Sequence, residues 1–138
     1  MIHRKVESVN KTIIHCAGTK TSQKFSVDAC RKCHKEENGW EDIGYHYYIG
    51  LDGVLHLGRP VWYVGSHTYG KNTDSIGVCL EGGYNADGTQ WEKPLQAQEF
   101  TLKILLEVLK VTIPKMTIHG HYEFSEKTCP NYNIDHLK

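Results

Sequence analysis

Short apolar runs constrain the fold of this chain more than any other feature of its sequence. None of them is longer than four or five residues, which is too short to cross a membrane and is typical of strands buried in a sheet. Five segments are predicted to be strands: residues 12–16, 45–50, 54–57, 75–81 and 116–119. The second and third flank Asp52-Gly53, a dipeptide that favours a tight β-hairpin. A sheet is therefore expected at the centre of the fold.

Two longer segments carry the pattern of helices. Ser26 is a predicted N-cap for a helix over residues 27–38, and a second helix is predicted over about 94–112. The second helix has apolar residues at three- and four-residue steps that are expected to face the core: Ala97, Phe100, Ile104, Val108 and Val111. Strands interleaved with helices predict an α/β fold, with a central mixed β-sheet flanked by helices and a site in a groove at the strand ends.

Length, charge and cysteine content narrow the class of protein. A chain of 138 residues is expected to form one domain, and its formal net charge of zero lacks the basic excess that nucleic-acid binding usually needs. Five Cys is an odd number and below the density of a disulfide scaffold, so reduced thiols or thiolate ligands are expected. The polar N-terminus lacks the apolar core of a signal peptide, which predicts a protein held at first in a cytoplasm.

Cys30-Arg31-Lys32-Cys33-His34 matches the C-x-x-C-H pattern of covalent haem attachment. That attachment takes place outside the cytoplasm, and the segment lies inside a predicted helix, where Cys30, Cys33 and His34 share one face. A structural zinc would need four ligands, and no second paired motif lies nearby. The pattern therefore favours a helix face over a haem or metal site.

A second group combines His15, the His119/His121 pair and Cys129. Imidazole and thiolate are the ligands that zinc prefers, and a catalytic zinc keeps three protein ligands and one open position. His15 ends one predicted strand, the two histidines end another, and Cys129 follows in the next loop, so neighbouring strands would bring them together. Surface histidines beside a buried thiol explain the same residues equally well.

Tyr45-His46-Tyr47-Tyr48 lies in a predicted strand, where alternation would place Tyr45 and Tyr47 on one face and His46 and Tyr48 on the other. Aromatic residues in strands usually serve packing. Beside a metal, however, a phenol could donate a hydrogen bond to a developing oxyanion, and Lys127 could act in the same way with its cation.

Several ordered motifs then match one family together. They are Ile14-His15-Cys16; Gly39-Trp40-Glu41-Asp42-Ile43-Gly44-Tyr45-His46-Tyr47-Tyr48-Ile49 with Asp52-Gly53; Val64-Gly65-Ser66-His67; Asn72-Thr73-Asp74-Ser75-Ile76-Gly77-Val78; and Gly120-His121-Tyr122-Glu123 running on to Lys127-Thr128-Cys129-Pro130. From about residue 11 to 132, the chain resembles the zinc-dependent N-acetylmuramoyl-L-alanine amidases of the peptidoglycan recognition superfamily, and in particular the small phage endolysins.

The resemblance implies a role for each matching residue. It assigns one Zn²⁺ ion to His15, His121 and Cys129, because Gly-His followed by Lys-x-Cys-Pro fits His121 rather than His119. It assigns catalytic roles to Tyr45 and Lys127. His46, His67 and Asn72 fall in groove or support positions, which predicts substrate binding. Residues 1–138 would form a single amidase catalytic domain without a separate cell-wall-binding domain.

The implied activity is hydrolysis of the amide between N-acetylmuramic acid and L-alanine in peptidoglycan, by a zinc-activated water, with lysis of the host cell. The enzyme is expected to be a monomer without nucleic-acid or stable membrane partners, kept in the host cytoplasm until the membrane is breached. One alternative is a non-catalytic peptidoglycan-recognition module; such members have typically lost the Cys ligand, which is present here as Cys129. Another is a phage amidase that also binds and inhibits the phage RNA polymerase.

Overall fold

The computed structural model describes residues 1–138 and contains a five-stranded mixed sheet in the order β4-β3-β5-β1-β7. The strands are β1 (Lys11–Cys16), β3 (Tyr47–Ile49), β4 (Leu55–Leu57), β5 (Ser75–Leu80) and β7 (Thr117–Gly120). β1 pairs in parallel with both β5 and β7, β3 pairs in parallel with β5, and β4 is antiparallel to β3. The predicted α/β fold with a mixed sheet is confirmed; the predicted strand ends are off by about one residue, except at β3, which begins two residues later than predicted.

A second, two-stranded parallel sheet pairs β2 (Thr19–Lys20) with β6 (Gly83–Tyr84). These strands follow β1 and β5 closely in the chain, so they continue the central pairing beyond the carboxyl ends of both strands. Neither segment is among the strands predicted from the sequence. Two-residue strands with polar and glycine residues have no periodicity to identify them.

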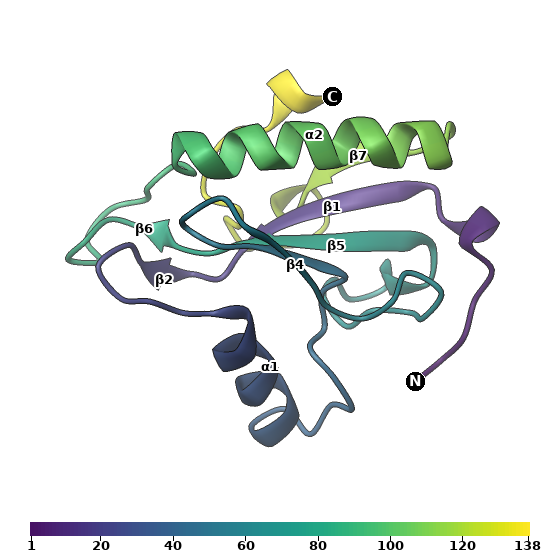
Figure 1. The fold of residues 1–138 in the computed structure, drawn as a ribbon, viewed down its shortest axis with the longest axis horizontal. Coiled ribbons are helices and arrows are strands. Elements are labelled where there is room, and N and C mark those ends of the chain that lie inside the picture. Colours follow the sequence, from purple (N-terminus) through teal and green to yellow (C-terminus); the bar gives the residue numbers. More distant parts are fainter.

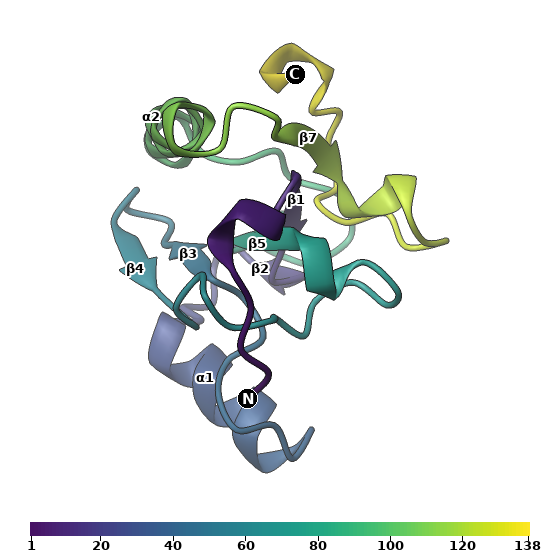
Figure 2. The same cartoon turned by 90° about the vertical axis from the view of Figure 1, so that its right-hand side faces the viewer.

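Two helices cover opposite faces of the central sheet, as Figure 1 shows for α1 (Val27–Glu36) and α2 (Gln96–Thr112). Ser26 caps α1 as predicted, since its side chain accepts a hydrogen bond from the Ala29 amide at 3.1 Å. Figure 2 shows the same layers from the side, with β4 beneath α2 on one flank and β7 on the other. Four short 3₁₀ turns complete the structure: η1 (Val6–Ser8), η2 (Asn72–Asp74), η3 (His121–Glu123) and η4 (Asp135–Leu137).

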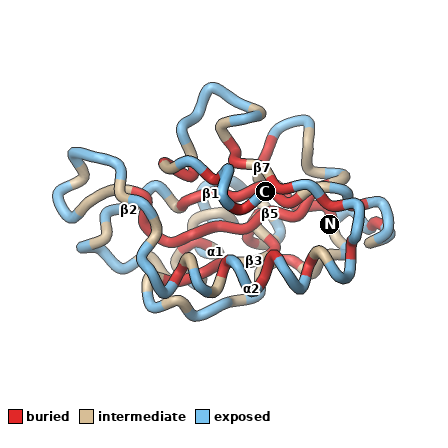
Figure 3. The backbone as a smooth tube through the Cα atoms, turned by 90° about the horizontal axis from the view of Figure 1, so that it is seen from above, coloured by how far each residue is buried: buried red, intermediate tan, exposed pale blue.

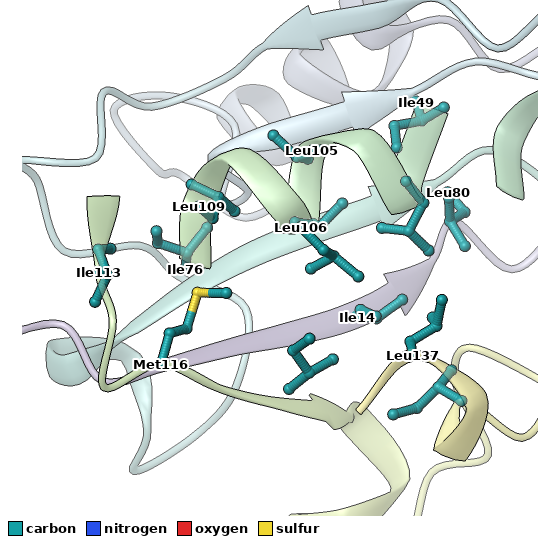
Figure 4. Packing of buried hydrophobic residues seen from close by; sticks show 14 of the residues in the cluster. Ile14, Ile49, Ile76, Leu80, Leu105, Leu106, Leu109, Ile113, Met116 and Leu137 are labelled. Atoms are coloured by element: carbon teal, nitrogen blue, oxygen red, sulfur yellow. The ribbon is translucent and has the colours of Figure 1, made fainter. Parts of the chain in front are cut away.

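The main core lies between α2 and the sheet, where leucines of the helix pack on isoleucines of the strands (Figure 4). Figure 3 shows β1 and β5 as buried strands in the middle of the molecule. A smaller core under α1 contains Cys30, Ile43, Tyr48 and Cys79. Cys79 is fully buried in this core, and Cys30 is buried on the inner face of α1.

The face of α2 that packs on the sheet differs from the predicted one. Phe100, Ile104, Val108 and Val111 are 52–82% exposed. The buried positions are instead Gln98, Leu102, Leu105, Leu106 and Leu109. The helix carries two apolar stripes, and the stripe that contains the leucines packs on the sheet. The predicted core face of this helix was therefore wrong. None of the helices has the length and apolar character needed to cross a bilayer.

Truncation of two neighbouring α2 residues tests this assignment. Leu102→Ala removes a fully buried side chain and is expected to lower the free energy of unfolding by about 2–5 kcal/mol. Ile104→Ala is expected to cost less than about 1 kcal/mol, because that side chain is half exposed. Urea unfolding followed by circular dichroism measures both, and equal losses would contradict the assignment.

Candidate metal centre and groove

The register of the parallel strands places His15 beside His121. Ile14 of β1 pairs with Gly120 of β7, so the next residue on each strand emerges at the same edge of the sheet. The two imidazole rings lie with centroids 4.4 Å apart. They line a groove of about 820 Å³ at the carboxyl ends of the strands, with Cys129 and Lys127 from the following loop. This is the predicted place for a site in an open α/β sheet.

His15, His121 and Cys129 form the group of side chains that could hold a metal ion. Their ligand atoms all lie within 4.8 Å of one another. The Cys129 Sγ also accepts a hydrogen bond from the Cys16 amide at 3.0 Å, which favours the thiolate form. Two imidazoles and one thiolate are a donor set that zinc accepts, and three protein ligands leave a position open for water.

The electrostatics of the three residues also suit a cation. Burial lowers the pKa of His15 well below its usual value, and neighbouring His67, His121 and Lys127 lower it further. Burial and Lys127 likewise lower the pKa of His121, so both rings are neutral near pH 7 and can donate a lone pair. The pKa of the Cys129 thiol is raised by its contact with the Cys16 thiol and by burial, so metal binding must displace a proton.

Tyr45 lies against His15, one of the three candidate ligands. Its ring centroid is 5.2 Å from that of His15, and burial raises the pKa of its phenol well above the usual value, so the hydroxyl keeps its proton. Tyr45 packs with Tyr48 on the α1 side, whereas Tyr47 packs on the α2 side. The predicted alternation was wrong here because β3 begins only at Tyr47, and regular alternation starts there.

His67 and Asn72 line the groove opposite Lys127. The Asn72 side-chain oxygen accepts hydrogen bonds from the backbone amides of His67 and Thr68, both at 2.9 Å, and so fixes the loop that carries them. His67 Nδ1 lies 2.9 Å from His15 Nε2. Asn72 therefore shapes the groove wall, while His67 reaches a candidate ligand.

His46 lies below the groove and not in its wall. Its ring is 1% exposed, and both nitrogens are occupied by backbone groups: Nδ1 accepts from the Gly77 amide at 3.0 Å, and Nε2 lies 2.9 Å from the Tyr63 carbonyl. The structure thus gives His46 no surface for the predicted substrate contact. It joins β5 to the loop that precedes the groove.

Arg4 is a support residue that the sequence did not single out. Its buried guanidinium donates to the carbonyls of Asn72, Thr73 and Ser75 at 2.8–3.1 Å. It also donates to Val61 and touches the ring of His46. An isolated Arg near the N-terminus carries no pattern that would reveal this role.

Two residues of the C-x-x-C-H segment stay together and the third points away: Cys30 Sγ lies 3.9 Å from His34 Nε2, whereas the Cys33 thiol bonds to neither. His34 lines the groove, with its ring 4.8 Å from Trp40 and 5.5 Å from Tyr45, while its Nδ1 accepts from the Gly44 amide. Cys33 instead bonds the Glu37 carboxylate on the outer side of α1. His34 was not identified from the sequence as a groove residue. His119 lies outside the groove, bonded to Thr117 and Glu123.

Comparison with known proteins identifies the class. A family model described as N-acetylmuramoyl-L-alanine amidase matches residues 5–132, and the chain belongs to this family. The endolysin of Escherichia phage T7 is 39% identical over 128 residues, covering 93% of this chain and 84% of that protein. The endolysin of Enterobacteria phage K11 is 37% identical over 130 residues, covering 94% of this chain and 85% of that one.

Solved structures agree with the family. The endolysin amidase LysCS from Clostridium intestinale URNW superposes with a TM-score of 0.84 at 26% identity, covering 100% of this chain and 86% of that one. Drosophila PGRP-LB superposes with a TM-score of 0.80 at 26% identity, covering 93% of this chain and 77% of that one. The resemblance seen in the sequence motifs is confirmed.

The buried His46 predicts a pH dependence of stability. Burial lowers its pKa from 6.5 to about 4, with Arg4 and Arg59 adding to the effect, while the Tyr63 carbonyl opposes it. Below pH 6.5 the unfolded chain takes up a proton that the folded chain refuses, so stability falls as the pH falls. Between pH 7 and 5 this group is expected to cost about 2 kcal/mol.

Urea unfolding of the metal-free protein at pH 7 and pH 5 measures this loss. His46→Gln is expected to lose about 2 kcal/mol less than the parent over that interval. His56→Gln, on the edge strand β4, is the matched control and is expected to keep the parent's dependence. Equal pH dependence in the two variants would contradict the role of His46.

Proposed function

We propose that this protein is a zinc-dependent endolysin that hydrolyses the amide between N-acetylmuramic acid and L-alanine in peptidoglycan. The observation that carries the proposal is the convergence of His15, His121 and Cys129 at one end of the groove. The family supplies the reaction class, and the phage endolysin relatives supply the biological setting. The groove volume of about 820 Å³ leaves room for more than the scissile amide, as a glycan-peptide substrate requires.

Zinc fits the three residues by donor chemistry. Two neutral imidazoles and one thiolate would leave a single net positive charge. When bound, zinc supplies a Lewis acid that activates water and offsets negative charge on the carbonyl oxygen of the scissile amide. The Cys16 amide helps to hold the Cys129 thiolate, because its N–H points at Sγ.

We assign to Tyr45 and Lys127 the stabilisation of the negative charge that develops on that carbonyl oxygen. The Tyr45 hydroxyl keeps its proton and can donate a hydrogen bond to the oxyanion. The Lys127 ammonium lies close enough to His15 and His121 to influence both rings and supplies a positive charge at the same end of the groove. Each such donor is typically worth about 100-fold or more in rate.

An enzyme is favoured over a non-catalytic recognition module by the completeness of this set. A binding module would need the groove but not three converging metal donors beside a neutral phenol and an ammonium group. The enzyme would act on peptidoglycan after release from the host cytoplasm. A monomeric state and binding to the phage RNA polymerase stay predictions from the sequence.

Purified peptidoglycan provides the direct test. Incubation with the zinc-loaded protein is expected to release new L-alanine amino termini, detected by N-terminal labelling, and to clear suspensions of outer-membrane-permeabilised Gram-negative cells. A chelator is expected to abolish both signals, and added zinc to restore them. Absence of new L-alanine termini would refute the amidase, whereas full activity in chelator would refute the metal.

Replacement of one thiol tests the ligand assignment. Cys129→Ala is expected to bind less than one zinc ion per chain and to lose nearly all activity, because a ligand is removed. Cys33→Ala is the matched control: this thiol lies on α1 away from the groove and should leave both properties unchanged. Elemental analysis after dialysis gives the zinc content, and a Cys129→Ala protein with full zinc would reject the assignment.

Removal of the two oxyanion donors tests their role separately from metal binding. Tyr45→Phe and Lys127→Met are each expected to lower kcat by about 100-fold while zinc content stays at one ion per chain. Lys115→Met, at a lysine before β7, serves as the control for loss of a positive charge. A variant that loses zinc together with activity would show a structural role instead.

A further inference from the structure

We propose that His67 is a positioning residue that fixes the proton of His15 on Nε2 and so leaves Nδ1 as the nitrogen that binds the metal. This inference rests on the proposed zinc site, but it concerns residues of this chain that can be observed without metal. It assigns a specific role to a histidine that otherwise belongs to the groove wall.

The contacts form a continuous chain of hydrogen bonds behind the candidate ligand. His15 Nε2 lies 2.9 Å from His67 Nδ1, and His67 Nε2 lies 3.3 Å from the Ser75 hydroxyl. The Ser75 hydroxyl donates to the Lys71 carbonyl at 2.7 Å. Ser75 is fully buried, so water does not offer it another acceptor.

The hydrogen bond from Ser75 to Lys71 sets the direction of the other hydrogen bonds in this series. A carbonyl oxygen only accepts, so the Ser75 proton points to Lys71 and the Ser75 oxygen is left to accept from His67 Nε2–H. A neutral imidazole carries one proton, so His67 Nδ1 is bare and must accept from His15 Nε2–H. His15 then has its lone pair on Nδ1. The opposite direction would cost the 2.7 Å bond of Ser75.

Thr68 is compatible with this arrangement. Its hydroxyl lies 3.0 Å from His67 Nδ1 and 3.3 Å from His15 Nε2. Because a hydroxyl can both donate and accept, it can share the hydrogen bond between the two rings in either direction. The direction is therefore set by Ser75 and not by Thr68.

Glycines hold the His67 ring in this place. A Cβ atom at Gly77 would come within 2.6 Å of the ring, and one at Gly65 within 2.8 Å. The ring therefore occupies space that a side chain at either glycine position would enter. Asn72 fixes the backbone of His67 from the third side. A support built this way is pre-organised before any metal arrives.

The group that accepts the hydrogen bond from His15 carries no charge. Metal-binding histidines usually donate their second N–H to a carboxylate, a carbonyl or water. Here the acceptor is an uncharged imidazole, so it orients His15 without adding a negative charge behind the metal site. The net positive charge of the zinc and its three ligands would therefore stay available to the substrate carbonyl.

Nuclear magnetic resonance of the metal-free wild-type protein tests the tautomers directly. Long-range ¹H–¹⁵N correlation spectra of protein labelled with ¹⁵N-histidine, at pH 7, are expected to show Nε2–H for both His15 and His67. A single Nδ1–H form of either ring, or an even mixture, would overturn the proposal. The measurement needs neither zinc nor substrate, so its outcome is separate from that of the proposed function.

Zinc affinity, measured by competition with a chromophoric chelator, tests the consequence. His67→Leu removes the acceptor at similar size and is expected to weaken zinc binding by about 10–100-fold. His67→Asn places a carbonyl oxygen near the original Nδ1 and is expected to recover part of the loss. His56→Leu is the control and should bind as the parent does. An unchanged dissociation constant in folded His67→Leu would overturn the proposal.

A milder variant keeps the test decisive if His67→Leu does not fold. Ser75→Ala removes only the acceptor of His67 Nε2–H, so we expect Nδ1–H forms of both rings to appear in the spectra and zinc affinity to fall several-fold. Unchanged tautomers of His15 and His67 in Ser75→Ala would refute the proposal that Ser75 sets the direction of these hydrogen bonds. Failure of the wild-type protein to bind zinc would refute the proposed function and leave the tautomer result standing.

Discussion

Parallel pairing of β1 between β5 and β7 is the constraint on which the rest of the structure depends. β1 is flanked on both sides, so its register is set by two ladders of backbone hydrogen bonds. A slip of one residue would turn every side chain of the strand to the other face and carry His15 out of the groove. The same pairing keeps Ile14 in the core beneath α2. Core packing and site geometry are thus two results of one register.

Behind the groove, backbone carbonyls are tied down by buried cations. Arg4 crosses from the N-terminal segment to the carbonyls of residues 72, 73 and 75, and Arg59 donates to those of Ile43 and Val64. Neither guanidinium has a carboxylate within salt-bridge distance. The N–H groups of each therefore donate to backbone carbonyl oxygens of the loops. These loops carry His67 and Tyr45, which explains how irregular segments can hold side chains in fixed positions.

The sequence predicted those features whose cause is local. Apolar runs identified β1 and β5, and Ser26 marked the start of α1, since strand burial and helix capping depend on a few adjacent residues. The face of α2 was not predictable in this way. Its two apolar stripes have the same spacing, and only the sheet opposite decides that Leu102 is buried and Ile104 is not.

The candidate site also contains some features that the sequence predicted and others that it did not. Motifs pointed to His15, His121 and Cys129, which the fold brings together, but motif matching did not separate His46 below the groove from His67 in its wall. That difference arises because strand β3 begins only at Tyr47, leaving His46 in an irregular segment whose side-chain direction no periodicity describes. Arg4 and Ser75 act through backbone carbonyls and buried hydroxyls, which leave no recognisable spacing in a sequence.

The strand order has a consequence for the folding of the chain. The β3–β4 hairpin is the one local pairing in the sheet, whereas β1 must find partners about 64 and 106 residues further along the chain. Closure of such long loops is slow, and β7 is the last strand to be synthesised. His121 and Cys129 reach His15 only when that final strand has docked. We therefore expect a nascent or partly folded chain to lack the candidate metal centre, which forms only with the completed fold.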